Sequence, residues 1–141
     1  MITNQIINQY WDYGILPINP QTITERIGLK FSISYRTGFI KNNTIFINPL
    51  NTRIRNNFIV AHLLGHHVLH GSDFTETPDN FSFMVLDLNE KEANAFALEL
   101  LMPSEYLKKI VQKYTKLEKI CDIFQVSQLA CDIRLQQLRL I

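Results

Sequence analysis

One long helix limits how this chain can fold more than any other feature of the sequence. Residues 52–70 show helical rather than alternating hydrophobic periodicity. One face of this helix is lined by Phe58, Ala61, Leu64, Gly65, Val68 and Leu69. The same helix contains the stretch FIVAHLLGHHVLH, with all four histidines of the chain. The other elements must therefore be arranged around a helix that is both apolar and rich in histidine.

The residues before this helix predict two helices and a small sheet. We expect a helix over about residues 2–11 and a second one that Asn19 caps and Gly28 ends. KFSISY predicts a strand, and GFIKNNTIFINP predicts a hairpin that turns at Asn42 and Asn43. After Gly71 we expect a polar loop to about residue 80, and FSFMVLD fits either a strand or an ordered loop.

The residues after the loop predict only helices. Asn89 is the expected start of a helix that Pro103 limits, and Ser104 starts the next one. Thr115 and Glu118 have capping-box spacing for a third helix, and Ser127 caps a fourth. The order of elements predicts an α+β fold, with about three strands packed on the histidine helix and a helical C-terminal region.

Composition favours one domain and argues against several classes of partner. The 141 residues are 46% hydrophobic, which is enough for a single domain over residues 1–141, divided into a core (1–103) and a helical region (104–141). The net charge of +1 does not point to nucleic acid or to an anionic membrane. Because we find neither a secretory signal nor a membrane-spanning run, we expect a cytoplasmic protein with Cys121 and Cys131 as reduced core thiols.

The spacing of the histidines suits a metal ion. Residues four apart on a helix lie on one face, about 6 Å apart along its axis. His62 and His66 can therefore bind one zinc ion together. His70 lies about 12 Å from His62 along the axis and is expected to support the site without binding the ion. His67 points about 100° away from His66, off the site. Histidines that only form hydrogen bonds on a half-buried helix face are the alternative, and the spacing alone leaves it open.

The acidic segment that follows offers further ligands. NEKEANAFALELLMP places Glu90, Glu92 and Glu99 on an otherwise apolar helix, and one carboxylate would complete a site of two histidines and one glutamate. Asn89 and Glu92 also have the spacing of a capping box. The spacing therefore does not separate a ligand role of Glu92 from a capping role.

These two segments resemble the ImmA/IrrE-type metallopeptidases, cytoplasmic zinc-dependent proteins of bacteria, phages and mobile elements. The family core reads roughly A-H-E-x-G-H-x-x-L-H, followed by E-A-N-x-F-A-x-x-L-L-M-P; this chain has AHLLGHHVLH and EANAFALELLMP. The resemblance covers almost the whole chain and implies a zincin-like fold. It also implies zinc bound by His62, His66 and Glu92, and we place Asn94 with His70 in a supporting role.

The resemblance implies a partner as well. Members of the family typically act on, or together with, a helix-turn-helix repressor, and so switch on genes for element transfer, lysogeny exit or stress response. Residues 118–138 are similar to a helix-turn-helix, but their mild charge does not favour direct binding to DNA.

Leu63 is the departure from the family pattern. In H-E-x-x-H enzymes the glutamate at this position takes a proton from water and passes it to the leaving amine. Leucine can neither accept nor donate a proton. Losing a general base costs about 10²–10⁴-fold in rate. We therefore expect a zinc-binding pseudo-peptidase that acts by binding its partner. The alternatives are an active peptidase with Glu90, Glu99 or His67 as the base, a metal-free interaction module, and a DNA-binding protein.

Overall fold

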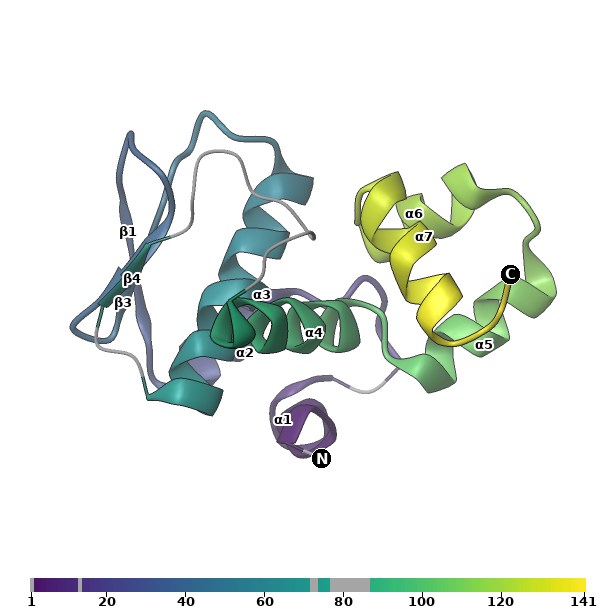
Figure 1. Ribbon diagram of the computed structural model, residues 1–141, viewed down its shortest axis with the longest axis horizontal. Helices are drawn as coiled ribbons and strands as arrows, with labels where there is room; N and C mark the ends of the chain where they lie inside the picture. Colours follow the sequence, from purple (N-terminus) through teal and green to yellow (C-terminus); the bar gives the residue numbers. More distant parts are fainter. Residues whose placement is uncertain (1, 13, 72–73, 77–86) are drawn as a thin grey trace.

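The computed structural model describes residues 2–12, 14–71, 74–76 and 87–141. Within these ranges it is built from seven helices and four strands (Figure 1). The helices are α1 (Ile2–Tyr10), α2 (Pro20–Ile27), α3 (Arg53–His70), α4 (Leu88–Leu101), α5 (Ser104–Lys113), α6 (Leu117–Phe124) and α7 (Gln128–Gln137). The strands are β1 (Lys30–Ile33), β2 (Phe39–Lys41), β3 (Thr44–Ile47) and β4 (Phe74–Glu76). The predicted α+β class is therefore confirmed.

Local signals place the second helix as predicted. The side chain of Asn19 accepts hydrogen bonds from the backbone N–H groups of Gln21 at 3.0 Å and Thr22 at 3.4 Å. Gly28 ends α2 in the left-handed region with φ 114°, a conformation that glycine adopts at little cost.

The sheet has the strand order β1-β3-β2-β4. β2 and β3 form the predicted hairpin, in which Asn42 (φ 51°) and Asn43 (φ 58°) both adopt the left-handed conformation that a two-residue turn needs. β1 pairs with β3 in parallel. β4 is one strand more than expected: it lies in the predicted polar loop and pairs with β2, and such a distant pairing leaves no local signal. Residues 81–86 of FSFMVLD lie outside the described residues.

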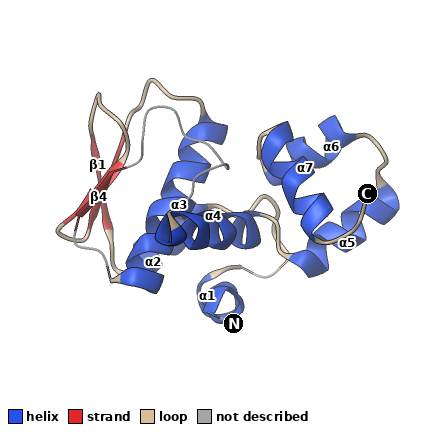
Figure 2. Ribbon diagram, in the orientation of Figure 1, coloured by secondary structure: helices blue, strands red, loops and turns tan. Residues whose placement is uncertain are grey.

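Helix α3 lies at the centre of the fold, between the sheet and the C-terminal helices (Figure 2). Ile40 and Ile45 of the sheet are fully buried in the same hydrophobic core as Leu63 and Leu64 of α3. The most extensive contact between two elements joins α3 and α4. Gly65 permits this close approach, because a Cβ atom there would lie 3.0 Å from Cδ1 of Phe96 and 3.2 Å from Cα of Ala93.

The C-terminal helices lie on the far side of α3 from the sheet (Figure 1). Ser127 caps α7 as predicted, accepting from the backbone N–H of Ala130 at 3.1 Å. The capping box predicted at Thr115 is wrong: α6 begins one residue later, after Lys116, without a side-chain cap. Arg134 of α7 is buried and donates through Nε to the carbonyl of Met102 at 3.0 Å, which fastens α7 to the end of α4.

Two further properties bear on the sequence-based expectations. Cys121 and Cys131 are both free and buried. None of the helices in the described ranges is long and apolar enough to cross a membrane.

Candidate metal centre

Helix α3 buries two histidines one turn apart. Thr52 caps the helix by accepting from the backbone N–H of Arg55 at 3.2 Å, and His62 and His66 follow in its second half. The two residues are 0% and 3% exposed. Their Nε2 atoms lie 3.2 Å apart, so both imidazoles present the same nitrogen to one point.

The first turn of α4 brings a carboxylate to that point. Asp87 caps α4 by accepting from the backbone N–H of Glu90 at 3.2 Å, which fixes Glu90 in the first helical turn. The Oε1 atom of Glu90 lies 2.7 Å from Nε2 of His66, and its Oε2 atom lies 3.1 Å from Nε2 of His62. One ligand atom from each of the three residues lies within 4.8 Å of the others. His62, His66 and Glu90 thus form a three-residue cluster, which we call the metal centre.

The carboxylate at the metal centre belongs to Glu90 and not to Glu92, the third ligand that the sequence analysis expected. The side chain of Glu92 is 48% exposed, and its Oε1 atom lies 3.8 Å from Nε2 of His70. The reason is where the helix begins: Asp87, not Asn89, is the cap. Residues two apart on a helix point about 200° away from each other, so Glu90 and Glu92 cannot both reach the Nε2 atoms of His62 and His66. Asp87-x-x-Glu90 has the same capping-box spacing as Asn89-x-x-Glu92. The sequence therefore offers two possible starts for α4, and the spacing gives no reason to prefer either one.

The residues expected to support the site lie beside it. Nδ1 of His70 is 3.2 Å from Nδ1 of His66. Asn94 is buried on α4, close to the imidazole of His62. Each imidazole of the metal centre therefore has a polar neighbour behind it, the arrangement that orients histidine ligands in metal sites.

Two of the three residues named as substitute bases lie away from the metal centre. Glu99 accepts a hydrogen bond from Oγ1 of Thr3 at 2.8 Å, which ties α4 to α1. It lies nine residues beyond Glu90, about 13 Å along the helix and on the opposite face. His67 is half-buried on α3, one position beyond His66. Only Glu90 reaches the imidazoles, and it does so as a member of the cluster.

Burial keeps both imidazoles neutral. Desolvation is the main cause that lowers the pKa of His62 from 6.5 to about 4, and the negative charge of Glu90 opposes it only in part. Desolvation likewise lowers the pKa of His66, again against the charge of Glu90. At neutral pH both side chains are therefore uncharged, the form in which imidazole binds a metal.

The donor set, two neutral imidazole nitrogens and one carboxylate, suits a divalent cation. If both Nε2 atoms of His62 and His66 carry protons, two N–H groups crowd together at 3.2 Å. If His62 lacks the proton, its lone pair faces an oxygen of Glu90 at 3.1 Å. One cation satisfies all three donors at once, and zinc bonds of about 2.0–2.1 Å place neighbouring tetrahedral ligands about 3.3 Å apart. Two of the three distances, 3.2 and 3.1 Å, are close to that value, whereas the 2.7 Å between Glu90 and His66 is a hydrogen-bond distance.

Leu63 occupies the position next to His62 where the peptidase motif has its glutamate. Its side chain is 0% exposed and belongs to the hydrophobic core. It therefore offers neither a proton acceptor nor a path for water. The cluster can hold a cation, but this position supplies no base.

Comparison with known proteins agrees with this geometry. Residues 19–136 match the model of the IrrE N-terminal-like domain, a peptidase family. A protein named Metallopeptidase ImmA, from Bacillus subtilis (strain 168), is 33% identical over 84 residues, which cover 57% of this chain and 49% of that protein. The chain spans about half the length of this curated relative.

Proposed function

Because the chain belongs to the family of IrrE N-terminal-like domains, we propose that it is an ImmA/IrrE-like zinc protein that has lost efficient peptidase chemistry. The α+β architecture is consistent with the minimal metallopeptidase fold of that family. Its activity is to bind a protein partner, a helix-turn-helix repressor. The observation that carries the proposal is a complete cluster of two histidines and one glutamate beside Leu63.

His62, His66 and Glu90 hold the zinc in this proposal. The ion, when bound, supplies Lewis-acid polarisation of a carbonyl or water oxygen. Binding through Nε2 leaves the proton of His66 on Nδ1, which then donates to Nδ1 of His70 at 3.2 Å. His70 therefore fixes the tautomer and the ring orientation of His66, and Asn94 lies close to His62.

Leu63 separates metal binding from catalysis. Hydrolysis of a peptide needs a group that takes a proton from the attacking water and delivers it to the leaving amine. The leucine side chain has no atom that can do this, and Glu90 is already a ligand. The expected loss is about 10²–10⁴-fold in rate relative to a chain with a base at this position.

The partner is proposed from the resemblance and from the matched relative. The chain shares the family motifs around both histidines and across α4, and the similar Bacillus subtilis protein carries the name of a metallopeptidase, which acts on protein chains. We therefore place the protein in gene regulation, as an antirepressor in a phage, a mobile element or a stress response. It would bind its repressor at or beside the metal centre, without needing to cleave it.

One paired experiment tests this function. Zinc is measured by elemental analysis in protein purified without a histidine tag, and the protein is incubated with a candidate helix-turn-helix repressor. We expect about one zinc per chain, repressor binding without cleavage by the protein as it stands, and cleavage by Leu63→Glu. Leu63→Gln is the matched control, because it has the same shape as Leu63→Glu but no base.

The outcomes separate the alternatives. Zinc-dependent cleavage by the unaltered protein would show that another residue acts as the base, and His67→Ala and Glu99→Gln would then test the two candidates that lie outside the cluster. Protein that takes up no zinc would instead support a metal-free interaction module.

A further inference from the structure

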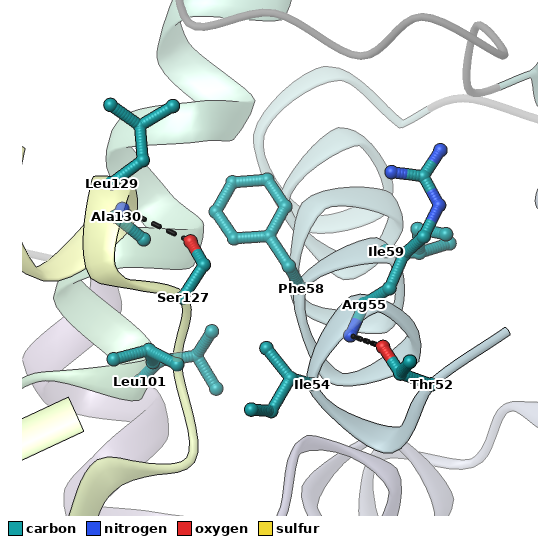
Figure 3. Close-up of a pocket in the computed structure, with 10 residues that line it drawn as sticks. Thr52, Ile54, Arg55, Phe58, Ile59, Leu101, Ser127, Leu129 and Ala130 are labelled. Atoms are coloured by element: carbon teal, nitrogen blue, oxygen red, sulfur yellow. Dashed lines mark hydrogen bonds between the residues drawn. The ribbon is translucent and has the colours of Figure 1, made fainter. Parts of the chain in front are cut away.

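A groove lies between the first half of α3 and the start of α7 (Figure 3). Its volume is about 300 Å³. Ile54, Phe58 and Ile59 line one side, Leu129 and Ala130 line the other, and Leu101 of α4 also lines the groove. We call it the Phe58 groove. Ile54 and Leu129, at its rim, are 36% and 59% exposed, so two large apolar side chains face solvent here.

The Phe58 groove and the metal centre lie along one face of α3. Ile54, Phe58, His62 and His66 are four residues apart in sequence, so they form a continuous row on the helix. The rings of Phe58 and His62 stack, with their centroids 6.3 Å apart. A chain that passes over the metal centre therefore reaches the groove within one helical turn.

The spacing of this row matches an extended peptide. Four residues of α3 advance about 6 Å, and alternate side chains of an extended chain are about 6.6 Å apart on the same side. A segment laid along α3 with one residue outside the metal centre, where the side chain of Glu90 is 20% exposed, thus places the side chain two residues away over Phe58. The groove volume, near the lower end for ligand pockets, suits one large side chain and is too small for a helix.

The chemistry of the lining narrows the choice of side chain. Most of the lining is aliphatic or aromatic, and among the described residues that line it only Arg55 carries a charge. Thr52 and Ser127, the N-caps of α3 and α7, also line the groove, so the positive ends of two helix dipoles face it. A basic residue is therefore disfavoured there, and acidic residues next to an apolar one are favoured.

We propose that the Phe58 groove receives a large apolar side chain, flanked by acidic residues, from an extended segment of the partner protein whose chain crosses the metal centre. This inference rests on the proposed function, because that function places a protein chain at the metal centre. It adds the class of residue that the partner must present two positions away from its residue at the metal centre. The groove thereby gives a protein without efficient catalysis a means to select its partner.

The test uses short peptides of defined sequence as probes. Acetyl-Gly-Asp-Leu-Asp-Gly-amide is titrated into the zinc-supplemented protein and compared with the same peptide in which serine replaces leucine, or lysines replace both aspartates. Binding is followed by NMR through the methyl signals of Ile54 and Leu129. Burying a leucine side chain should make the first peptide bind about tenfold or more tightly than the serine peptide. The lysine peptide should bind more weakly than the first.

Variants assign this difference to the groove. Leu129→Asp should abolish the preference for leucine, whereas Leu50→Asp, at an 81% exposed leucine outside the groove, should leave it intact. Ile54→Ser is the second groove variant, for use if Leu129→Asp does not fold by circular dichroism. The proposal is wrong if the leucine and serine peptides bind equally, if neither binds at millimolar concentration, or if the preference survives both groove variants.

Zinc binding, measured in the same samples by competition with a chelator, separates the two proposals. Normal zinc binding without leucine preference overturns the groove and leaves the proposed function standing. A leucine preference in protein that binds no zinc overturns the metal centre and leaves the groove.

Discussion

Glu90 and Glu92 are close in sequence, yet their carboxylates have different surroundings. Glu90 lies 2.7 Å from His66, whereas Glu92 is half-exposed and 3.8 Å from His70. Glu90→Gln should therefore lower zinc affinity by at least about 100-fold, because even residues that only support a metal ligand contribute 10–100-fold. Calorimetric titration with zinc measures the effect. Glu92→Gln is the matched control and should bind zinc nearly as well as the unaltered protein; the reverse order would restore Glu92 as the ligand.

The burial of Leu63 also leads to a prediction about the stability of the protein. Its side chain is fully buried, so Leu63→Gln and Leu63→Glu should each lower the free energy of unfolding of the metal-free protein by about 2–5 kcal/mol. Saturating zinc should recover more stability in Leu63→Glu than in Leu63→Gln, because only a carboxylate is attracted to the cation. Urea unfolding with and without zinc measures the difference. Equal recovery in both variants would mean that residue 63 does not face the metal centre.

At the scale of elements, the metal centre depends on the distance between α3 and α4. Gly65 lies where the two helices touch, and a Cβ atom there would be 3.0 Å from Phe96. Gly65→Ala should push α4 away and lower the free energy of unfolding by about 1–3 kcal/mol. It should also weaken zinc binding, since the histidines and Glu90 are on different helices. Ala95→Ser, on the exposed side of α4, is the control and should change neither; unaltered zinc affinity in Gly65→Ala would show that the centre tolerates the shift.

Elements with a strong local signal could be predicted, and those decided by packing could not. Asn19 and Gly28 bound α2, Asn42 and Asn43 make the hairpin turn, and Ser127 caps α7, each through its own side chain or backbone. The start of α4 had two equivalent capping patterns, two residues apart. Contact with α3 decides between them, and that contact is not visible in the sequence around α4.

The same distinction applies to the metal centre. His62 and His66 belong to one helix, so their spacing alone predicted that they would lie together. The third donor comes from another helix, and its identity required knowing which face of α4 meets α3. The Phe58 groove was not predicted at all, because its walls come from three helices and no spacing rule connects Phe58 with Leu129.

For the whole molecule, the C-terminal helices matter because they complete a surface of α3. Arg134 holds α7 against the end of α4, and this contact positions Leu129 opposite Phe58. α3 therefore meets three parts of the chain: the sheet, the carboxylate of α4, and the start of α7. A partner that binds along α3 would contact residues that are far apart in sequence, so truncation after α4 should remove the groove and leave the three residues of the metal centre.

Cys131 provides a test of the packing that holds α7 in place. The residue is 0% exposed, and burial raises the pKa of its thiol from 9.0 to about 12. The folded protein thus keeps the thiol protonated at a pH where the unfolded chain releases the proton. This contribution to stability is complete below pH 9 and is lost as the pH rises from 9 towards 12.

The loss from Cys131 should reach about 2 kcal/mol at about pH 10.5, at about 1.4 kcal/mol per pH unit above 9. Urea unfolding at about pH 8 and 10.5 measures it, and Cys131→Ala corrects for all other groups that titrate in this range. The unaltered protein should lose more stability than Cys131→Ala over the same interval. Parallel losses in both proteins would mean that water reaches the thiol in the folded state, and that α7 packs less tightly on α6 than the buried cysteines indicate.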